Sequence, residues 1–409
     1  MTQHDDDLDL FSDARTERHR PVRRDRGGRK PPPPPRKRRR TGLWIGMVVV
    51  LALIAAGGYY GYQQLTGIGG YEDFAGQGET DVVVQVNDGD STGDIAATLV
   101  DSGVVASSRA FVAAAESNAD VRGVQPGYYV MKTKASGAAA VDKIVDPASR
   151  VGAMEIKPGA QLENIILGDE KVVKGITTML ADASCAELNG KSTCVTAEQL
   201  AEVAKTADLA KLGVPEWAVP DASKAEPQRR LEGLIMPGVY HVKPGSTPEE
   251  LWTQLVTESA TQMQAAGLPD IAKDTGYTPY QVLVMASLVE KEAITEDFYK
   301  VSRVTYNRLR ESMRLQYDST INYVLDRPAI RTNPEDRDKV GAYNTYDNTG
   351  LPPTPISAPG KTALDAAVKP EPGEWLFFVK CEKDGTSCFA VTNDEHNANR
   401  VKAQENGAY

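Results

Sequence analysis

Two glutamates on one predicted helix are the residues of this chain best suited to acid chemistry. Glu290 and Glu292 lie in the segment MASLVEKE, and residues 278–281, TPYQ, supply the Thr, Pro and Gln that favour the first turn of a helix. The predicted helix, from about 278 to 293, is apolar nearly all round. Both carboxyls should therefore lie in partly dry surroundings, which raise the pKa of a carboxyl and let it keep a proton near neutral pH.

The spacing of these glutamates does not match the arrangement of ordinary glycosidases. Side chains two residues apart on a helix point about 200° from each other, whereas glycosidases place two carboxyls on either side of the scissile bond. Helix geometry alone does not decide which glutamate would be the acid. The alternative is a structural role for both, with Lys291 or Arg308 as ion-pair partners.

Polar residues that could bind a sugar follow this helix. A second helix is predicted from about 296 to 311, with Asn307 and Arg308 exposed. After it come MRLQYDST (313–320) and AYNTYDNTGLPPTPISAPG (342–360). Tyr, Asn and Gln side chains can hydrogen-bond hydroxyl and acetamido groups, and aromatic rings can stack on sugar faces. A purely structural ordered loop is the alternative explanation.

The composition excludes several classes of function. The net charge of -10 combines +6 in residues 1–41 with -16 in the remainder, and an acidic bulk argues against binding nucleic acid through its phosphates. The sequence has four His and no HExxH motif, so a multi-histidine metal centre is not expected. A hydrophobic fraction of 41% over 409 residues is enough for two or three compact units.

Residues 43–62 are predicted to cross a membrane once. A basic run, residues 36–40, precedes a stretch from Thr41 to Tyr71 that carries no charge, and a span needs about 20 mostly apolar residues. Because basic flanks stay on the cytoplasmic side, we expect a single-pass protein of the cell membrane with residues 1–42 in the cytoplasm and the rest outside the cell. A cleaved signal peptide is the alternative.

All four cysteines lie on the outer side of this predicted span. They form two close pairs, Cys185 with Cys194 and Cys381 with Cys388. Paired cysteines outside the cytoplasm most simply form disulfides, and the spacings are not those of CxxC zinc sites. We therefore predict two structural disulfides, each closing a short loop or hairpin.

The part beyond the span is predicted to have an α+β fold. Strands near 82–86, 153–156 and 237–241 each end at a glycine turn that leads into a helix, and this pattern resembles LysM-like glycan-binding modules. The predicted organisation is a disordered tail (1–42), a transmembrane helix (43–62), a linker (63–79), a LysM-like α/β module (80–150) and a mixed α+β catalytic domain (151–400) with an insert at about 181–230.

One motif in the first of these repeats could be taken for a serine nucleophile. Residues 89–93, GDSTG, fit G-x-S-x-G between a strand and a helix. Ser91 with Asp94 also makes a capping box, in which the serine begins the helix. A helix cap is the simpler interpretation.

The motifs from residue 231 onward resemble the YceG-like family of endolytic murein transglycosylases. They are LEGLIMPGVY (231–240), ASLVEKE (286–292), VTYNRLRESMRLQYDST (304–320) and AYNTYDNTGLPPTPISAPG (342–360). The resemblance extends more weakly back to about residue 80. The chain departs from the family pattern at Pro237-Gly238-Val239-Tyr240, where P-D-T-Y is usual, and in its cysteine pairs and insert.

The resemblance implies a lytic reaction on peptidoglycan without a cofactor. The first Glu of the family motif is the catalytic acid, which here is Glu290. It would protonate the oxygen between MurNAc and GlcNAc while the MurNAc 6-hydroxyl attacks C1, giving a 1,6-anhydro product. Six further residues match family motifs and are candidates for substrate contact or for orienting Glu290: Glu232, Gln316, Asp318, Tyr343, Asn344 and Thr345.

The implied partners are peptidoglycan glycan strands and cell-wall synthases of the penicillin-binding class. The alternative function is a non-enzymatic scaffold that binds glycan at the cell wall or divisome. A desolvated acid on the helix favours the enzyme, because a scaffold has little need for one.

Overall fold

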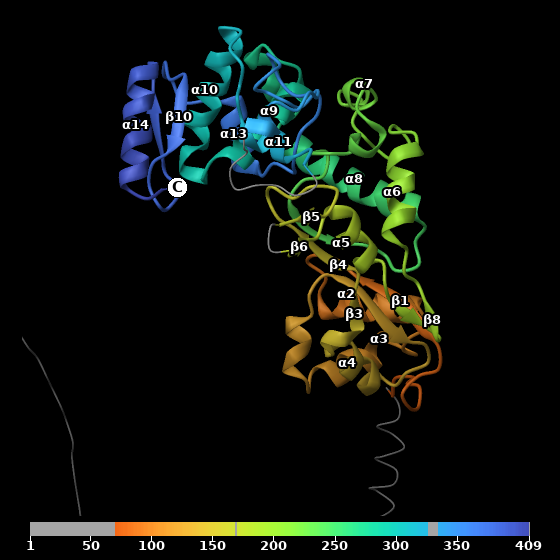
Figure 1. Cartoon of the computed structure of the whole chain (residues 1–409). Helices are drawn as coiled ribbons and strands as arrows, with labels where there is room; N and C mark the ends of the chain where they lie inside the picture. Colours follow the sequence, from red (N-terminus) through yellow and green to blue (C-terminus); the bar gives the residue numbers. More distant parts are fainter. Residues whose placement is uncertain (1–69, 168–169, 326–333, 409) are drawn as a thin grey trace, which may run out of the picture. The chain divides into compact units, whose positions relative to one another are not determined.

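The computed structural model describes residues 70–167, 170–325 and 334–408. The predicted tail, the predicted membrane span and the first seven residues of the predicted linker, 63–69, lie outside these residues. Within the described ranges, no helix combines the length and the apolar character that crossing a membrane requires. The described chain has a mixed α+β fold, as predicted (Figure 1).

The first part of the described chain is a three-stranded antiparallel sheet with helices packed on it (Figure 1). Strand β1 (Asp81–Val86) pairs with β2 (Gly127–Lys132), and β3 (Arg150–Val151) pairs with the other edge of β2. The helices are α2 (Thr92–Asp101), α3 (Ser108–Ala115) and α4 (Gly137–Val145), with 3-10 turns at Ala119–Gly123 and Pro147–Ser149. Their buried valines, alanines and aromatic side chains form a hydrophobic cluster of their own.

Serine caps begin these helices. The hydroxyl of Ser91 accepts from the backbone N–H of Asp94, and the Asp94 carboxylate accepts from the backbone N–H of Ser91, which is the predicted capping box. The Ser91 hydroxyl also donates to Asp94 Oδ2 at 2.6 Å. Ser107 and Ser136 cap α3 and α4 in a similar way. The GDSTG motif is therefore used as a helix start, worth about 1 kcal/mol of stability.

A single glycine connects this sheet to the next one. Gly152 separates β3 from β4 (Ala153–Ile156), and β4 pairs antiparallel with β9 (Gly238–His241). The carbonyl of Gly152 accepts from the N–H of Val242 at 2.8 Å. Gly152 has φ of 75°, and a Cβ there would lie only 2.0 Å from the Val242 carbonyl oxygen, so this junction requires glycine.

The prediction of a helix after the strand at 153–156, which is β4 in the structure, is wrong. After β4 the chain forms a glycine turn and then a hairpin of β5 (Ile165–Ile166) and β6 (Val172–Val173). Between β4 and β5, backbone N–H groups form hydrogen bonds with residues far away in the sequence. Gly159 N–H donates to the Ala358 carbonyl, and Leu162 N–H donates to Glu232. These long-range bonds replace the local bonds of a helix. After β2 and β9, in contrast, helices do follow the turn, at α4 and at α8 (Pro248–Ala265).

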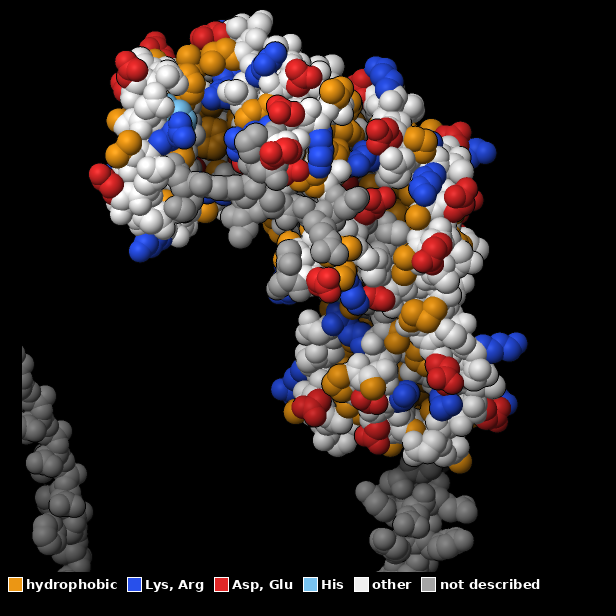
Figure 2. All heavy atoms as spheres, viewed as in Figure 1, with side chains coloured by type: hydrophobic (Ala, Val, Ile, Leu, Met, Phe, Trp, Pro, Cys, Tyr) orange, Lys and Arg blue, Asp and Glu red, His pale blue; other side chains and the backbone are white. Residues whose placement is uncertain are grey.

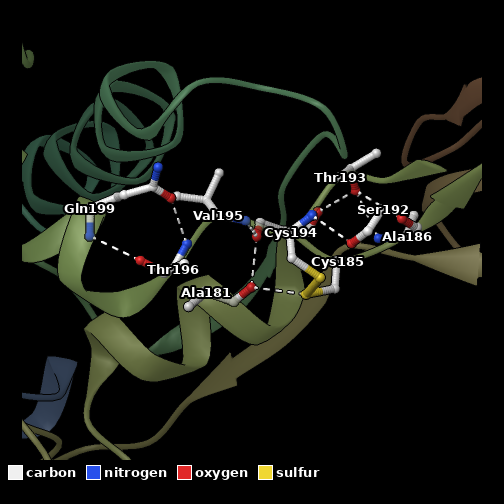
Figure 3. The surroundings of a disulfide bond; sticks show 10 residues. Ala181, Cys185, Ala186, Ser192, Thr193, Cys194, Val195, Thr196 and Gln199 are labelled. Carbon is white, nitrogen blue, oxygen red and sulfur yellow. Dashed lines mark hydrogen bonds between the residues drawn. A yellow bond between two sulfur atoms is a disulfide. The ribbon is translucent and has the colours of Figure 1, made fainter.

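The predicted insert contains small elements held by a disulfide. Helix α5 (Ile176–Ala183) is followed by the hairpin of β7 (Glu187–Leu188) and β8 (Lys191–Ser192), and then by α6 (Ala197–Thr206) and α7 (Val219–Ala222). Cys185 and Cys194 are bonded across the base of this hairpin, as predicted (Figure 3). The second predicted disulfide, Cys381–Cys388, links the hairpin of β10 (Phe377–Lys380) and β11 (Ser387–Ala390).

The tip of the β7–β8 hairpin contacts the first sheet. Asn189 accepts from the N–H of Asp81 at 2.8 Å, and its own N–H donates to the Asp81 carboxylate at 2.8 Å. The Asn189 side-chain amide also donates to the Asp81 carbonyl, and Lys132 forms a salt bridge with the same aspartate at 2.9 Å. The disulfide-closed hairpin is therefore attached to strand β1.

Helix α9 (Pro279–Glu292) is buried among other helices. Thr278 caps it, with the predicted capping box to Gln281, and nine of its 14 residues are buried. It packs against α10 (Phe298–Arg310), α11 (Asp318–Asn322) and α13 (Lys361–Val368), which Figure 1 shows around it. The remaining helices are α12 (Pro334–Arg337) and α14 (Asn393–Glu405), with 3-10 turns at Pro227–Arg229, Asp270–Thr275 and Thr295–Asp297.

The prediction that α10 exposes Asn307 and Arg308 is wrong. Asn307 is fully buried and donates to the carbonyls of Gly373 and Trp375. Arg308 is 6% exposed and donates to the carbonyls of Leu315 and Leu376. The donor groups of both side chains are thus paired with backbone carbonyls, which compensates for their burial. Asn307 Oδ1 is buried and has no hydrogen-bond partner among the described residues.

Acidic and basic side chains are mixed over the face of the protein that Figure 2 shows. On this face, blue and red side chains alternate over the described residues, without a continuous basic track. A track of that kind is what binding to a phosphate backbone requires.

Candidate active site

Glu290 lies in the last turn of α9, where the helix leaves the core. The eight residues before it, Val282 to Val289, are all buried, and Glu290 itself is half-buried. The carboxyl is thus carried by a rigid, fully packed element and lies at the boundary between the dry interior and the surface. A general acid that acts on a large polymer needs both features.

The carboxyl of Glu290 accepts a hydrogen bond from the backbone of Gly360. The Gly360 N–H lies 3.0 Å from Glu290 Oε2, and Gly360 is the residue that begins α13. A Cβ at residue 360 would lie 3.3 Å from the same oxygen and 3.4 Å from Pro158 Cγ. A side chain at this position would therefore require Glu290 or Pro158 to shift by a few tenths of an ångström. The N-terminus of a helix carries partial positive charge, which favours the ionised carboxylate.

Burial of Glu290 outweighs these favourable contacts. Desolvation raises the pKa of its carboxyl, while the Gly360 N–H and the charge of Lys291 lower it, and the net effect is a raised pKa. The protonated form is therefore more populated near neutral pH than for an exposed glutamate. Once the proton leaves, the Gly360 N–H and Lys291 stabilise the anion.

Lys291 is the cation shared by the carboxyls of this region. Burial lowers its pKa, whereas the charges of Glu232, Glu290 and Glu292 raise it. Its Nζ donates to the Gly159 carbonyl at 3.4 Å. The structure therefore brings Glu232, predicted from a motif about 60 residues upstream, into the electrostatic neighbourhood of the predicted acid.

Glu292 occupies a different and more enclosed position. Its Oε1 accepts from the backbone N–H of Ser319 at 3.2 Å, and desolvation is the largest cause of its raised pKa. Its carboxyl is enclosed more fully than that of Glu290. The two glutamates thus face different segments, α13 and α11. Among the described residues, neither forms a direct salt bridge with Lys291 or Arg308. The two carboxyls still interact with the charge of Lys291 at longer range.

The polar loop, residues 342–360, runs from α11 to Glu290. Near its end, Ile356 N–H donates to the Ser287 hydroxyl of α9 at 3.0 Å, four residues before Gly360 reaches the acid. Near its beginning, the Tyr343 hydroxyl lies 2.8 Å from that of Thr354. The loop is therefore closed by its own contact between Tyr343 and Thr354 and attached to α9 through Ser287. This attachment places its last residue, Gly360, against the predicted acid.

Three of the predicted substrate-contact residues are buried within this loop: Tyr343, Asn344 and Thr345 are 2–3% exposed. Asn344 donates to the carbonyls of Arg337 and Lys339. The Thr345 hydroxyl accepts from the N–H of Tyr317 at 2.9 Å. These contacts order the loop against α11, and direct contact of the three side chains with substrate stays a prediction.

The other two predicted residues of this region lie beside Thr345 and Glu292. Gln316 is exposed, has φ of 53°, and donates its N–H to the Thr345 carbonyl at 3.0 Å. A positive φ is uncommon for a side chain other than glycine and marks a backbone held by its surroundings. Asp318 is half-buried and accepts from the Tyr346 hydroxyl at 2.6 Å. Its neighbour Ser319 contacts Glu292.

Glu232 is the most deeply buried of the predicted site carboxyls. It is 2% exposed, and its Oε2 accepts from the N–H of Leu162 at 3.3 Å and from the hydroxyl of Tyr323 at 3.1 Å. Burial raises its pKa to about 7, although the two hydrogen bonds and the charge of Arg229 lower it. Its Oε1 has no hydrogen-bond partner among the described residues.

Several residues that shape the site were not predicted. Gly159 and Gly360 border Glu290, and Arg229 places its guanidinium 4.4 Å from the centre of the Tyr323 ring. The two glycines stand in the turns K-P-G and A-P-G, and such turns signal a close backbone approach. The position of Arg229 in the site carries no signal in the sequence, because the aromatic rings that it contacts, Tyr323 and Tyr343, are about 100 residues away.

The fold described above belongs to a class of proteins that is already known. The model of the YceG-like family matches residues 84–402, so the chain belongs to the YceG-like family. A solved structure, that of a yceG-like protein from Listeria monocytogenes, superposes with a TM-score of 0.52 at 25% identity, over 78% of this chain and 98% of that one.

Two curated relatives carry the same name. The endolytic murein transglycosylase of Bacillus subtilis is 27% identical over 327 residues, which cover 79% of this chain and 85% of the relative. The endolytic murein transglycosylase of Streptococcus pneumoniae serotype 2 is 26% identical over 373 residues, which cover 87% of this chain and 64% of the relative. The chain therefore spans most of the first relative and less than two thirds of the second.

Proposed function

We propose that the chain is an endolytic murein transglycosylase that cuts glycan strands of peptidoglycan between MurNAc and GlcNAc. The names of the B. subtilis and S. pneumoniae relatives support the reaction class. The observation that carries the proposal for this chain is the half-buried carboxyl of Glu290, raised in pKa and held by Gly360 at the start of α13.

Glu290 acts first as acid and then as base. Its proton goes to the glycosidic oxygen, and the bond from C1 of MurNAc to that oxygen breaks. The MurNAc 6-hydroxyl oxygen forms the new bond to C1, and its proton returns to the carboxylate. One carboxyl is enough because the nucleophile belongs to the substrate. The Gly360 N–H, 3.0 Å from Oε2, stabilises the anion between the two transfers.

The remaining parts of the proposal concern where the enzyme works. Residues 43–62 anchor the chain in the cell membrane, with the active site outside the cell near newly made strands. The sheet of β1 to β3 acts as a LysM-like glycan-binding module, and its β1–α2–α3–β2 order with antiparallel β1 and β2 supports this. Cell-wall synthases of the penicillin-binding class supply the strands.

The test compares two glutamate variants of the full chain. Purified peptidoglycan is incubated with wild type, Glu290→Gln and Glu292→Gln, and 1,6-anhydro muropeptides are measured by mass spectrometry. Removing a general acid lowers the rate by about 10²- to 10⁴-fold, so Glu290→Gln should release almost none. Glu292→Gln is the matched control and should stay within tenfold of wild type.

Two results would contradict the assignment. Full release by Glu290→Gln with loss in Glu292→Gln would move the acid to Glu292. Glycan binding by the wild-type chain without any anhydro product would leave the alternative function, a non-enzymatic cell-wall scaffold.

A further inference from the structure

The lysine that follows the predicted acid binds a backbone carbonyl rather than a carboxylate. Lys291 Nζ donates to the Gly159 carbonyl at 3.4 Å, which is a long hydrogen bond. Among the described residues, it forms no direct salt bridge with Glu290, Glu292 or Glu232. A partly buried lysine that has three carboxyls nearby and no ion pair with any of them needs a physical explanation.

The Gly159 carbonyl is held in place by the polar loop. Gly159 N–H donates to the Ala358 carbonyl at 2.8 Å, and Ala358 N–H donates to the Ala160 carbonyl at 2.7 Å. Two residues further along the loop, Gly360 N–H donates to Glu290 Oε2 at 3.0 Å. The backbone group that holds the lysine and the one that holds the acid therefore belong to the same two hydrogen-bonded segments.

The side chains of Glu290 and Lys291 both pass close to Gly159. A Cβ on this glycine would lie 3.9 Å from Glu290 Cγ, 3.7 Å from Lys291 Cδ and 3.9 Å from Lys291 Nζ. Successive side chains leave a helix about 100° apart, so these two diverge at α9 and converge on one backbone position. The ammonium thus lies near the acid while its hydrogen bond goes to the glycine carbonyl.

Glu232 is a second charge that acts on Lys291. The segment that holds the lysine continues to Leu162, whose N–H donates to Glu232 Oε2 at 3.3 Å. Three carboxyls raise the pKa of Lys291, and the effect of Glu232 is larger than those of Glu290 and Glu292. The charge of the lysine is therefore shared among several carboxyls and is not neutralised by the acid alone.

The other charged side chains on the elements around this pair are either exposed or act on Glu292: Lys157 and Lys361, Asp318 and Lys380. Lys361 forms a salt bridge with Asp365 at 2.7 Å. Lys291, in contrast, lowers the pKa of Glu290 directly, together with the N–H of Gly360. The position of its ammonium consequently affects how readily Glu290 ionises.

The distance between this cation and the acid affects the two proton transfers in opposite ways. A close opposite charge lowers the pKa of a carboxyl by about 1–3 units, and an ionised Glu290 has no proton to give to the glycosidic oxygen. Without a cation, burial keeps the carboxyl protonated, and the anion left after the first transfer is costly. A residue that acts first as acid and then as base needs a pKa near the working pH.

We propose that Lys291 is a positioning residue for the acid: the Gly159 carbonyl holds its ammonium near Glu290 and out of a direct ion pair, so that Glu290 can give up and take back one proton near neutral pH. The inference rests on the proposed function and adds to it the group that balances the two protonation states. In this role Lys291 acts through Glu290 and does not contact the reacting atoms.

The test follows the reaction as a function of pH, because the midpoint of a pH profile does not depend on how much of a variant is active. Release of 1,6-anhydro muropeptides from purified peptidoglycan is measured with the full chain from about pH 5 to 9. Lys291→Met removes the charge, and Lys291→Arg keeps it. Lys157→Met, at an exposed position two residues from Gly159, is the matched control.

The rate of the wild type should fall as the pH rises and Glu290 loses its proton. Lys291→Met should move the midpoint of this fall upward by at least about half a pH unit, because the carboxyl keeps its proton longer without the cation. Lys291→Arg and the screened surface variant Lys157→Met should stay within about 0.2 unit of the wild type.

Three results would overturn the inference: an unchanged midpoint in Lys291→Met, an equal shift in Lys291→Arg, or an equal shift in Lys157→Met. Circular dichroism melting of each variant verifies the fold. If Lys291→Met does not fold, Lys291→Gln removes the charge in its place and is judged by the same shift.

A second measurement needs no catalysis and keeps the two proposals distinguishable. A carbodiimide with an amine labels protonated carboxyls, and mass spectrometry of peptides locates the label at Glu290. The pH of half-maximal labelling should rise in Lys291→Met as the kinetic midpoint does. Such a rise without any anhydro product from wild type would support the coupling of Lys291 to Glu290 and overturn the enzymatic proposal. Anhydro product with both midpoints unchanged would support the enzyme and overturn the role of Lys291.

Discussion

Changing Glu232 to glutamine should make the protein more resistant to alkaline pH. The carboxyl of Glu232 is 2% exposed, and burial raises its pKa from 4.5 to about 7. Folding therefore favours the protonated form. Below pH 4.5 the carboxyl is protonated in both the folded and the unfolded chain, so burial carries no ionisation penalty there. As the pH rises through 7, the folded chain must either keep a proton that the unfolded chain has lost or bury a charge.

The size of the effect follows from this shift. A pKa difference of one unit corresponds to about 1.36 kcal/mol, so a rise from 4.5 to about 7 gives a full penalty of about 3 kcal/mol above pH 7. Between pH 5 and pH 8 the penalty grows by about 2.5 kcal/mol. Glutamine has nearly the shape of the protonated acid and keeps one oxygen for Leu162 and Tyr323, but it does not ionise.

The assay is urea unfolding of the full chain at several pH values between 5 and 8. The measured quantity is the free energy of unfolding of Glu232→Gln minus that of wild type, in which contributions of other titrating groups cancel. This difference should move by about 2.5 kcal/mol in favour of the variant as the pH rises. Glu155→Gln, at an exposed position of β4, is the control. A difference for Glu232→Gln that stays flat from pH 5 to 8 would refute the reasoning.

Two further predictions concern the glycine beside the acid and the disulfide-closed hairpin. Gly360→Ala places a methyl group 3.3 Å from Glu290 Oε2. It should lower kcat for anhydro-product release at least tenfold, while the melting temperature changes by only a few degrees. An unchanged kcat would show that catalysis does not depend on the close contact between Gly360 and Glu290. Replacing both Cys185 and Cys194 with serine opens a loop of 9 residues and should lower the free energy of unfolding by about 2–3 kcal/mol. A urea unfolding curve with the same midpoint and slope as that of the wild type would contradict this.

The parts of the site with local causes could be predicted from the sequence. Thr278, Pro279 and Gln281 determine where α9 begins, and its apolar residues determine that it is buried. Both features depend on residues within one or two helical turns. The two disulfides and the helix start at Ser91 depend in the same way on short spacings.

The parts that depend on distant partners could not be predicted. Arg308 was expected at the surface because its own helix gives no reason to bury it; one of its acceptors, the carbonyl of Leu376, is 68 residues away. The helix expected after β4 is absent because Leu162 donates to Glu232, 70 residues away. A helical period detects which residues face one another within a helix, and it carries no information on such pairings.

The attachment of the β7–β8 hairpin to strand β1 affects how the first sheet moves. The hydrogen bonds between Asp81 and Asn189 join positions 108 residues apart, and Gly152 joins the same sheet to the strand pair β4–β9 through Val242. Because both connections hold the first sheet, the sheet cannot rotate about Gly152 without breaking the hydrogen bonds between Asp81 and Asn189. A force applied to the chain at residue 81 is therefore transmitted to the β7–β8 hairpin as well as along the backbone.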